Sequence, residues 1–209
     1  MDWQRILYFI PGILIGLTVH EFAHAFASYK LGDTTARDQG RLTLNPIKHI
    51  DIIGFLFIIF AGFGWAKPVQ FNPENLSNLR RDKAVIAAAG PLSNLALGIL
   101  LCLAVRPLHI SFLSDEFFNP GIAVRHLYVV LYLAASINFG LFIFNLLPIP
   151  PLDGSHIVFS GLNLSYDLEE KIRKIGLPVL FLILIIQRQF DITIIPIGQA
   201  IAAIMDLFL

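Results

Sequence analysis

Long apolar runs, separated by short polar stretches, dominate the hydrophobic pattern of this chain. Three of them, Ile6–Ala27, Ala84–Val105 and Ala123–Leu146, contain 22 to 24 residues with at most one Asp, Glu, Lys or Arg each. A helix of 22 residues is roughly 33 Å long, which exceeds the roughly 30 Å hydrocarbon core of a bilayer. The pattern therefore predicts three membrane-spanning helices and an all-α polytopic membrane protein.

A fourth apolar run, Ile52–Ala66, differs from these three in length and composition. It has 15 residues and contains Gly54, Gly62 and Gly64. This is short for a membrane span, and glycine weakens a regular helix. Irregular backbone is tolerated at membrane depth where protein covers it. We therefore predict a re-entrant or β-like membrane-associated loop that does not cross the membrane, and its backbone from Gly54 to Gly64 could pair with an unwound peptide by strand addition.

The C-terminal part of the chain contains two shorter apolar runs. Ile175–Ile186 ends at the polar stretch Gln187-Arg188-Gln189, and Ile192–Leu209 follows. These runs predict either one span and one surface helix or two spans, and both alternatives remain open. The whole chain, residues 1–209, is predicted to form a single integral-membrane domain with a three-helix catalytic core over about residues 5–155.

Basic residues are concentrated in two of the polar stretches. Between residues 30 and 83 there are eight lysines and arginines against five acidic residues, and residues 171–174 contribute three more basic side chains. Because positive charge favours the cytoplasmic side of a membrane, both stretches are predicted to be cytoplasmic, in a protein of the cell membrane. The first and the third predicted spans then both end at the cytoplasmic face.

Composition narrows the possible function classes. Hydrophobic residues make up 56% of the chain and charged residues 14%, with a formal net charge of zero. Such a composition excludes a soluble enzyme, and the charge balance gives no reason to expect nucleic acid as a partner. The expected surroundings of this chain are a lipid bilayer.

The first predicted span carries ionisable residues at membrane depth. His20 and His24 are four residues apart, so they lie on one face of a helix, and Glu21 lies one position farther round. Two imidazoles can bind zinc, and a neighbouring carboxylate can take a proton from water activated by the metal. The alternative is a polar cluster that holds helices together, but the cost of such groups in a membrane favours a functional site.

Zinc bound by two histidines needs a further protein ligand. The glycine and third histidine of the extended motif are absent, because these positions are Ala27 and Lys30. Asp153 follows the third span directly after a proline-rich break, at the same predicted face as the histidine pair. It can share an ion with the histidines only if Ile52–Ala66 does not cross the membrane. The alternative for Asp153 is a turn aspartate before Gly154.

Four motifs, in their order along the chain, resemble the site-2 protease family of intramembrane zinc metalloproteases. They are His20-Glu21-Phe22-Ala23-His24, Gly64-Trp65-Ala66-Lys67-Pro68-Val69, Gly90-Pro91-Leu92-Ser93-Asn94, and the stretch from Asn145 through Pro148 to Asp153-Gly154. Together they cover about residues 14–154, and the combination is more specific than the first motif alone. The chain is similar to a short form of the family without a PDZ or CBS domain.

The resemblance implies a set of site residues and a reaction. One zinc ion would be held by His20, His24 and Asp153, with Glu21 as the catalytic acid and base. The family's substrates are transmembrane helices of other proteins, which are often regulators that cleavage releases. The resemblance therefore implies regulated intramembrane proteolysis, and the predicted topology places the active site toward the cytoplasmic side.

Two asparagines and one further histidine complete the candidate residues. The resemblance implies that Asn145 and Asn94 position the substrate or stabilise the developing oxyanion. Both asparagines could instead hydrogen-bond between helices. His156 lies three residues after Asp153 and is predicted to be a loop histidine that faces water, with a supporting contact to the metal site as the alternative.

A zinc-binding membrane protein without hydrolytic activity is the alternative function. A metal carrier needs ligands along a path across the membrane, and the predicted spans contain no second histidine or acidic cluster. A pseudoprotease, which only binds transmembrane helices, should have lost the glutamate of the motif, and Glu21 is present. These observations favour an intramembrane zinc metalloprotease.

Overall fold

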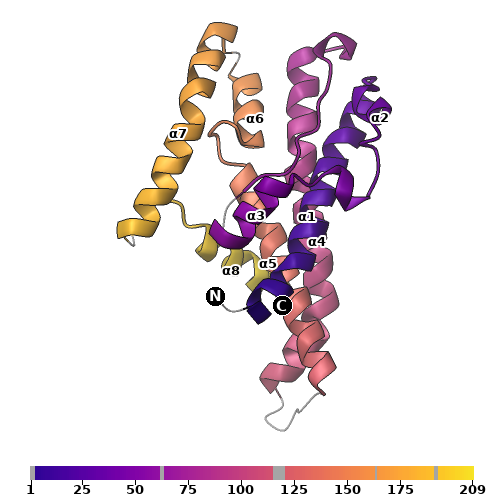
Figure 1. Ribbon diagram of the computed structural model, residues 1–209, viewed down its shortest axis with the longest axis vertical. Coiled ribbons are helices and arrows are strands. Elements are labelled where there is room, and N and C mark those ends of the chain that lie inside the picture. Colours follow the sequence, from indigo (N-terminus) through magenta and orange to yellow (C-terminus); the bar gives the residue numbers. More distant parts are fainter. Residues whose placement is uncertain (1–2, 62–63, 115–120, 163, 191–192) are drawn as a thin grey trace.

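The architecture is helical in the computed structural model, which describes residues 3–209 except 62–63, 115–120, 163 and 191–192. Three long helices, α1 (Trp3–Lys30), α4 (Leu79–Ser114) and α5 (Ile122–Asn145), pack side by side (Figure 1). Apolar sequences take this form because a bilayer leaves backbone groups no partners except those of their own helix. The predicted all-α membrane fold is confirmed.

The three long helices are also those that can cross a bilayer. They contain 28, 36 and 24 residues, which correspond to lengths of about 42, 54 and 36 Å. Within the described residues, only these helices combine the length and the hydrophobicity of a membrane span. α4 continues past Val105 to Ser114, where the sequence predicted a loop. The ring of His109 stacks on Tyr128 of α5 and stabilises this additional length.

Contacts between the long helices show their relative directions. His24 of α1 contacts Ile86 of α4, whereas Gly16, two turns earlier in α1, contacts Asn94 of α4. α1 and α4 are therefore antiparallel, and α5 returns alongside α4 (Figure 1). Because of these directions, the connection of residues 31–78 leaves and re-enters at the same end of the bundle. The C-terminal residues of α1 and α5 also lie at this end of the bundle.

Small residues allow the long helices to approach closely. A Cβ atom on Gly12 of α1 would lie 2.8 Å from the Cα atom of Ala134 in α5. Close backbone approach of this kind supplies the van der Waals contact that holds membrane helices together. The buried core of the bundle joins α4 and α5 to α8 (Ile197–Phe208) through Cys102, Ala135, Phe139 and Met205.

The apolar run after the first span forms α3 (Ile52–Ala61), a helix of ten residues. At about 15 Å it is too short to cross the membrane. The β-like alternative is wrong, because no strand occurs among the described residues. Gly54 lies inside α3, where a Cβ atom would meet the carbonyl oxygen of Trp65 at 2.1 Å. The chain folds back closely against α3, and the helical backbone of Gly54 is not available for strand addition.

The remaining parts of the connection between α1 and α4 are short. They are α2 (Thr35–Asp38), 3-10 helices at Pro46–Lys48 and Pro73–Asn75, and the irregular residues 64–72.

The buried carboxylate of Asp33 links the beginning of the connection between α1 and α4 to its last part by hydrogen bonds. Asp33, three residues after the end of α1, accepts hydrogen bonds from the backbone N–H of Asn72 at 3.0 Å and from the side chain of Asn75 at 2.8 Å. Burial opposes ionisation of Asp33, but these bonds and those from Thr35 outweigh it and lower its pKa. The residues that follow α3 are thereby held against α1.

The chain after α5 forms α6 (Asp153–Gly161), α7 (Tyr166–Phe190) and α8. α7 continues through residues 187–189, where the sequence predicted an interruption, and the side chain of Gln187 accepts a hydrogen bond at 3.0 Å from the backbone N–H of Ile195. α7 begins with charged residues, and α8, with 12 residues, is only about 18 Å long. Among the described residues, neither α7 nor α8 combines the length and hydropathy of a membrane span, so the two alternatives predicted from the sequence, each with at least one C-terminal span, are wrong for these helices.

Candidate metal centre

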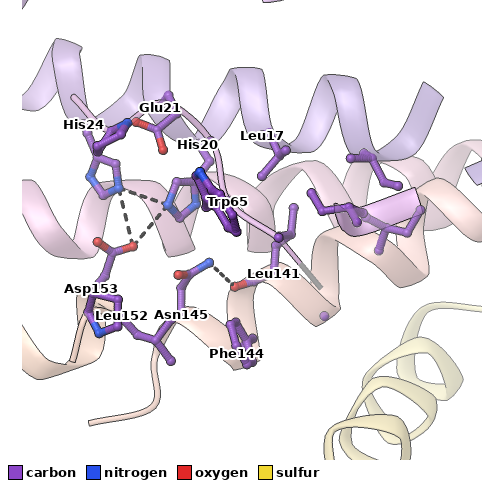
Figure 2. Close-up of a pocket in the computed structure, with 18 of the residues that line it drawn as sticks. Leu17, His20, Glu21, His24, Trp65, Leu141, Phe144, Asn145, Leu152 and Asp153 are labelled. Atoms are coloured by element: carbon purple, nitrogen blue, oxygen red, sulfur yellow. Dashed lines mark hydrogen bonds and ion pairs between the residues drawn. The ribbon is translucent and has the colours of Figure 1, made fainter. Parts of the chain in front are cut away.

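Two histidines and one aspartate meet near the end of the bundle at which α1 ends. His20 and His24 lie one turn apart on the same face of α1 and are 5% and 8% exposed. Asp153 is the first residue of α6, where the proline-rich stretch returns the chain toward α1. Its Oδ2 atom lies 3.1 Å from Nε2 of His20 and 3.4 Å from Nε2 of His24, and the two Nε2 atoms are 3.0 Å apart (Figure 2). The structure thus brings the three predicted ligand residues together.

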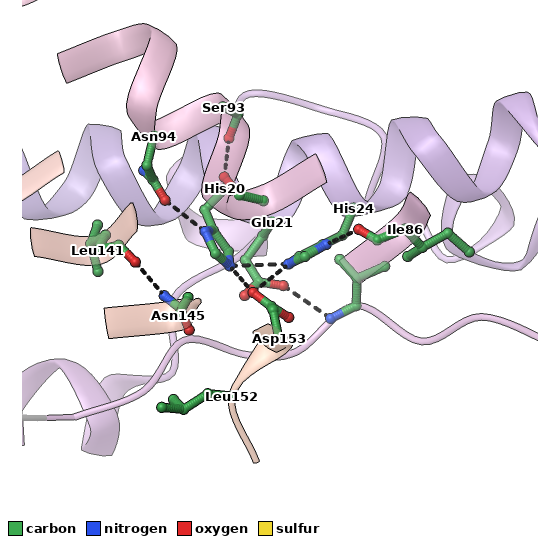
Figure 3. Close-up of polar contacts among 12 residues, drawn as sticks. His20, Glu21, His24, Ile86, Ser93, Asn94, Leu141, Asn145, Leu152 and Asp153 are labelled. Carbon is green, nitrogen blue, oxygen red and sulfur yellow. Dashed lines mark hydrogen bonds and ion pairs between the residues drawn. The ribbon is translucent and has the colours of Figure 1, made fainter. Parts of the chain in front are cut away.

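Hydrogen bonds on the other side of each imidazole determine which nitrogen carries the proton. Nδ1 of His20 donates to Oδ1 of Asn94 at 2.6 Å, and Nδ1 of His24 donates to the backbone carbonyl of Ile86 at 2.7 Å (Figure 3). Because both partners are acceptors, the proton of each neutral imidazole lies on Nδ1, and Nε2 has a free lone pair. Metal-binding histidines need this protonation state.

When both imidazoles are neutral, three acceptor atoms face one another with no proton between them. Oδ2 of Asp153 is buried and receives no hydrogen bond within the described part of the chain. This arrangement is unfavourable unless a cation lies between the three atoms. Ligand atoms about 2.0–2.1 Å from a tetrahedral zinc ion are about 3.3 Å apart. The observed separations of 3.0 to 3.4 Å fit zinc.

The space for this centre depends on a glycine of α4. A Cβ atom on Gly90 would lie 2.4 Å from Nε2 of His24 and 2.7 Å from Cε1 of His20. Both distances are shorter than any non-bonded contact between such atoms, so a larger residue would displace the imidazoles. Gly90 belongs to the third motif of the sequence, and its place against the two rings explains why glycine is needed there.

Glu21 lies beside the centre but is not one of the converging ligands. It is 8% exposed and lines the same cavity as the two histidines. Its Oε2 atom accepts a hydrogen bond at 3.0 Å from the backbone N–H of Val69, in the irregular segment after α3. The carboxylate of Glu21 is thus fixed next to the metal ligands by a residue that is distant in the sequence.

Arg41 is a further contact of Glu21, and sequence analysis missed it. Its side chain is buried, with Nη2 at 3.9 Å from Oε2 of Glu21, and it also donates a hydrogen bond to the carbonyl oxygen of Lys67. In the sequence, Arg41 contributed only to the positive charge that predicts membrane orientation. No spacing or motif links it to Glu21, because the contact arises only when the connection folds back on α1.

The two candidate asparagines occupy different surroundings. Asn145, at the end of α5, lines the cavity and donates one N–H to the carbonyl oxygen of Leu141 at 3.0 Å. Asn94 is fully buried behind His20, where its Nδ2 donates to the carbonyl oxygen of Gly16 at 3.0 Å and to Oδ1 of Asn138 at 2.9 Å. The amide of Asn94 is thus engaged at both ends by the neighbouring helices.

The centre opens into a cavity of about 1080 Å³. Its walls are mainly apolar and come from several helices, with Leu17 of α1, Leu141 of α5 and Leu180 of α7 as examples. Trp65, from the segment after α3, also lines this cavity, and in Figure 2 it is drawn beside His20. A buried polar centre therefore borders a large apolar space between α7 and the three-helix bundle.

His156 lies in α6, so the prediction of a loop histidine that faces water is wrong. Its partly buried side chain lines the cavity, and its Nδ1 atom contacts Nη2 of Arg173 in α7 at 3.4 Å. Burial, followed by the positive charges of Lys83 and Arg173, lowers the pKa of His156 to about 4. His156 is therefore neutral at pH 7 and forms part of the contact between α6 and α7.

Comparison with known proteins agrees with this geometry. Residues 107–187 match the model of peptidase family M50. The chain is 40% identical over 160 residues to the protein named "Putative zinc metalloprotease YwhC" of Bacillus subtilis (strain 168), and the alignment covers 72% of this chain and 67% of that protein. The chain belongs to peptidase family M50.

Two other relatives of this M50 chain carry the name "Putative zinc metalloprotease Rip2". The protein of Mycolicibacterium smegmatis is 34% identical over 163 residues, which are 74% of this chain and 57% of that protein. The protein of Mycobacterium tuberculosis (strain H37Rv) is 34% identical over 151 residues, which are 69% of this chain and 53% of that protein. The chain thus spans little more than half the length of these two relatives. No solved structure matches the chain.

Membership of family M50 confirms the resemblance that the motifs predicted. The chain is an intramembrane metalloprotease, and zinc is its metal.

Proposed function

We propose that this M50 chain hydrolyses peptide bonds within or near transmembrane segments of other membrane proteins, at a zinc centre formed by His20, His24 and Asp153. The supporting observation is the convergence of three acceptor atoms beside the buried carboxylate of Glu21, at the wall of a large apolar cavity. A zinc carrier has no use for a carboxylate fixed next to the metal but outside its ligands. A hydrolase needs that carboxylate as its base.

In the proposed hydrolysis, the metal and Glu21 have separate tasks. When bound at this centre, zinc supplies Lewis-acid polarisation and lowers the pKa of water toward about 7. The Glu21 carboxylate accepts a proton from the attacking water and donates it to the nitrogen of the leaving amine. Val69 and Arg41 hold the carboxylate in position before the reaction, so that little reorganisation is needed during it.

The two asparagines have different roles in this proposal. Asn145 uses one N–H for Leu141, and its amide can also donate to the carbonyl oxygen of the scissile bond at the cavity. Asn94 cannot do this without losing its bonds to Gly16 and Asn138. We therefore assign Asn145 to the substrate and Asn94 to the orientation of His20.

The substrate must be unwound where it is cut. A transmembrane helix bonds its own peptide groups, so the scissile bond is accessible only when local helix structure is lost. Trp65, Pro68 and Val69 belong to an irregular segment that lines the cavity, and those backbone groups of the segment that are not already bonded, as the N–H of Val69 is to Glu21, can hydrogen-bond an extended peptide. The apolar walls of the cavity suit the side chains of a membrane segment.

The proposed orientation places the centre toward the cytoplasm, and topology labelling tests it. In single-cysteine variants, Lys67→Cys and Lys171→Cys should react with a membrane-impermeant maleimide from the cytoplasmic side only. Leu113→Cys, near the far end of α4 and 76% exposed, is the control and should react from the opposite side. Labelling of residues 67 and 171 from opposite sides would exclude a shared centre.

Replacement of Asp153 tests the proposed function directly. The purified wild type should contain about one zinc ion per chain and cleave members of a panel of single-span substrates. Asp153→Asn removes the charge of one ligand, so zinc affinity and cleavage should both fall by at least about tenfold. Zinc content is measured by elemental analysis and cleavage by mass spectrometry of the products. A wild type that binds zinc but cleaves no substrate would favour the non-catalytic alternative.

A further inference from the structure

A chain of buried amides runs from the metal ligand His20 through all three long helices. Nδ1 of His20 in α1 donates to Oδ1 of Asn94 in α4 at 2.6 Å. Nδ2 of Asn94 donates to Oδ1 of Asn138 in α5 at 2.9 Å, and Nδ2 of Asn138 donates to the carbonyl oxygen of Ala134 at 2.8 Å. Asn94 and Asn138 are both fully buried.

The two imidazoles of the centre differ in the kind of group that accepts the hydrogen bond from Nδ1. His24 donates to the backbone carbonyl of Ile86, which can only accept. His20 instead depends on a side-chain amide, which could rotate by half a turn and present its NH₂ group. In that orientation Nδ1 of His20 would have to accept, and the proton would move to Nε2, the atom that faces Asp153 and the second histidine.

The amide chain excludes this rotated orientation. Both N–H groups of Asn94 face acceptors, namely Gly16 and Asn138, so a rotation would place its oxygen against two oxygen atoms. Asn138 is itself fixed, because its NH₂ group donates to a carbonyl of its own helix. Unsatisfied polar groups are costly in a membrane interior, which strengthens this preference.

We infer that Asn138 is a positioning residue of the zinc centre, which acts through Asn94 to keep the lone pair of His20 directed at the metal. This inference rests on the zinc centre proposed above. Asn138 lies more than 100 residues after the histidine motif and outside the four motifs of the sequence. Its hydrogen bonds within the described residues go to Asn94 and Ala134, and it is not among the residues that line the cavity. Its effect is on metal affinity, and the backbone carbonyl that orients His24 is independent of it.

The test compares Asn138→Leu with a matched control in α1. Thr18 is 4% exposed, lies two residues before His20, and donates to the carbonyl oxygen of Leu14 at 2.6 Å, so Thr18→Val also removes a buried hydrogen bond but leaves the amide chain intact. Zinc affinity is measured by competition with a chromophoric chelator, and ligand geometry by the visible spectrum of the cobalt-substituted protein. Thermal unfolding of both variants reports the loss of stability.

We expect Asn138→Leu to weaken zinc binding by about tenfold and to change the cobalt spectrum. Thr18→Val should change neither, even if its melting temperature falls as much. Zinc affinity of Asn138→Leu within twofold of the wild type, or an equal loss in Thr18→Val, would overturn the inference. A wild type without zinc would overturn the centre as well, whereas a wild type that binds zinc but cleaves nothing would contradict only the proposed reaction.

Discussion

Glu21→Gln should reduce peptide hydrolysis by about 10²- to 10⁴-fold and leave the zinc content unchanged. Glutamine has the shape of glutamate and can still accept the hydrogen bond from Val69, but it cannot take a proton from water. Because Glu21 is not one of the three converging ligands, the metal should remain bound. Single-turnover cleavage of a single-span substrate, together with elemental analysis for zinc, measures both quantities.

The control for this prediction is the same chemical change at Glu74, which is exposed in the 3-10 helix at Pro73–Asn75. Glu74→Gln should cleave at the wild-type rate. Unchanged cleavage by Glu21→Gln would show that another group is the base. Loss of zinc from Glu21→Gln would show instead that its carboxylate is a metal ligand.

Gly90→Ala should abolish most of the zinc binding and with it the activity. The added methyl group would overlap Nε2 of His24 at 2.4 Å, so either the imidazoles or the backbone of α4 must move. Overpacking of this kind typically costs about 1–3 kcal/mol, which corresponds to a loss of about 5- to 150-fold in zinc affinity if the strain falls on the ligands. Zinc affinity by chelator competition and cleavage of the same substrate check the prediction.

A glycine elsewhere in the membrane helices supplies the matched control. In Gly140→Ala the new Cβ atom would lie 3.4 Å from its nearest neighbour, the Cδ1 atom of Ile201, and a small shift of this flexible side chain can accommodate it. Gly140→Ala should retain wild-type zinc affinity. If Gly90→Ala retained it as well, the close packing of α4 against the two histidines would be disproved.

The amino-acid sequence alone determined the features that depend on local spacing. Hydrophobic runs of membrane length predict α1, α4 and α5, because a span requires a set number of apolar residues whatever surrounds it. The four-residue spacing of His20 and His24 places both on one helical face, because the helix repeat is a local property. The motifs predicted the family, and Asp153 was found because a broken helix after the third span is visible in the sequence.

Tertiary structure decided everything that depends on contacts between distant segments. The run after α1 forms a helix in which Gly54 lies close against Trp65, whereas its local composition allows both a helix and a strand. Arg41 and Val69 approach Glu21 only because the connection folds back on α1. Such contacts depend on the path of the connection, which residue spacing does not encode.

The two asparagines of the amide chain illustrate the same limit within the membrane. For Asn94 the sequence left two roles open, contact with the substrate and hydrogen bonding between helices, and the antiparallel packing of α1 and α4 places its oxygen on His20. Asn138 was not singled out, because a lone asparagine in an apolar run carries no local signal of its partner. The sequence determined which helices cross the membrane and which residues can bind zinc. The register between those helices decided which polar groups orient the ligands, because a shift of one turn would exchange every partner.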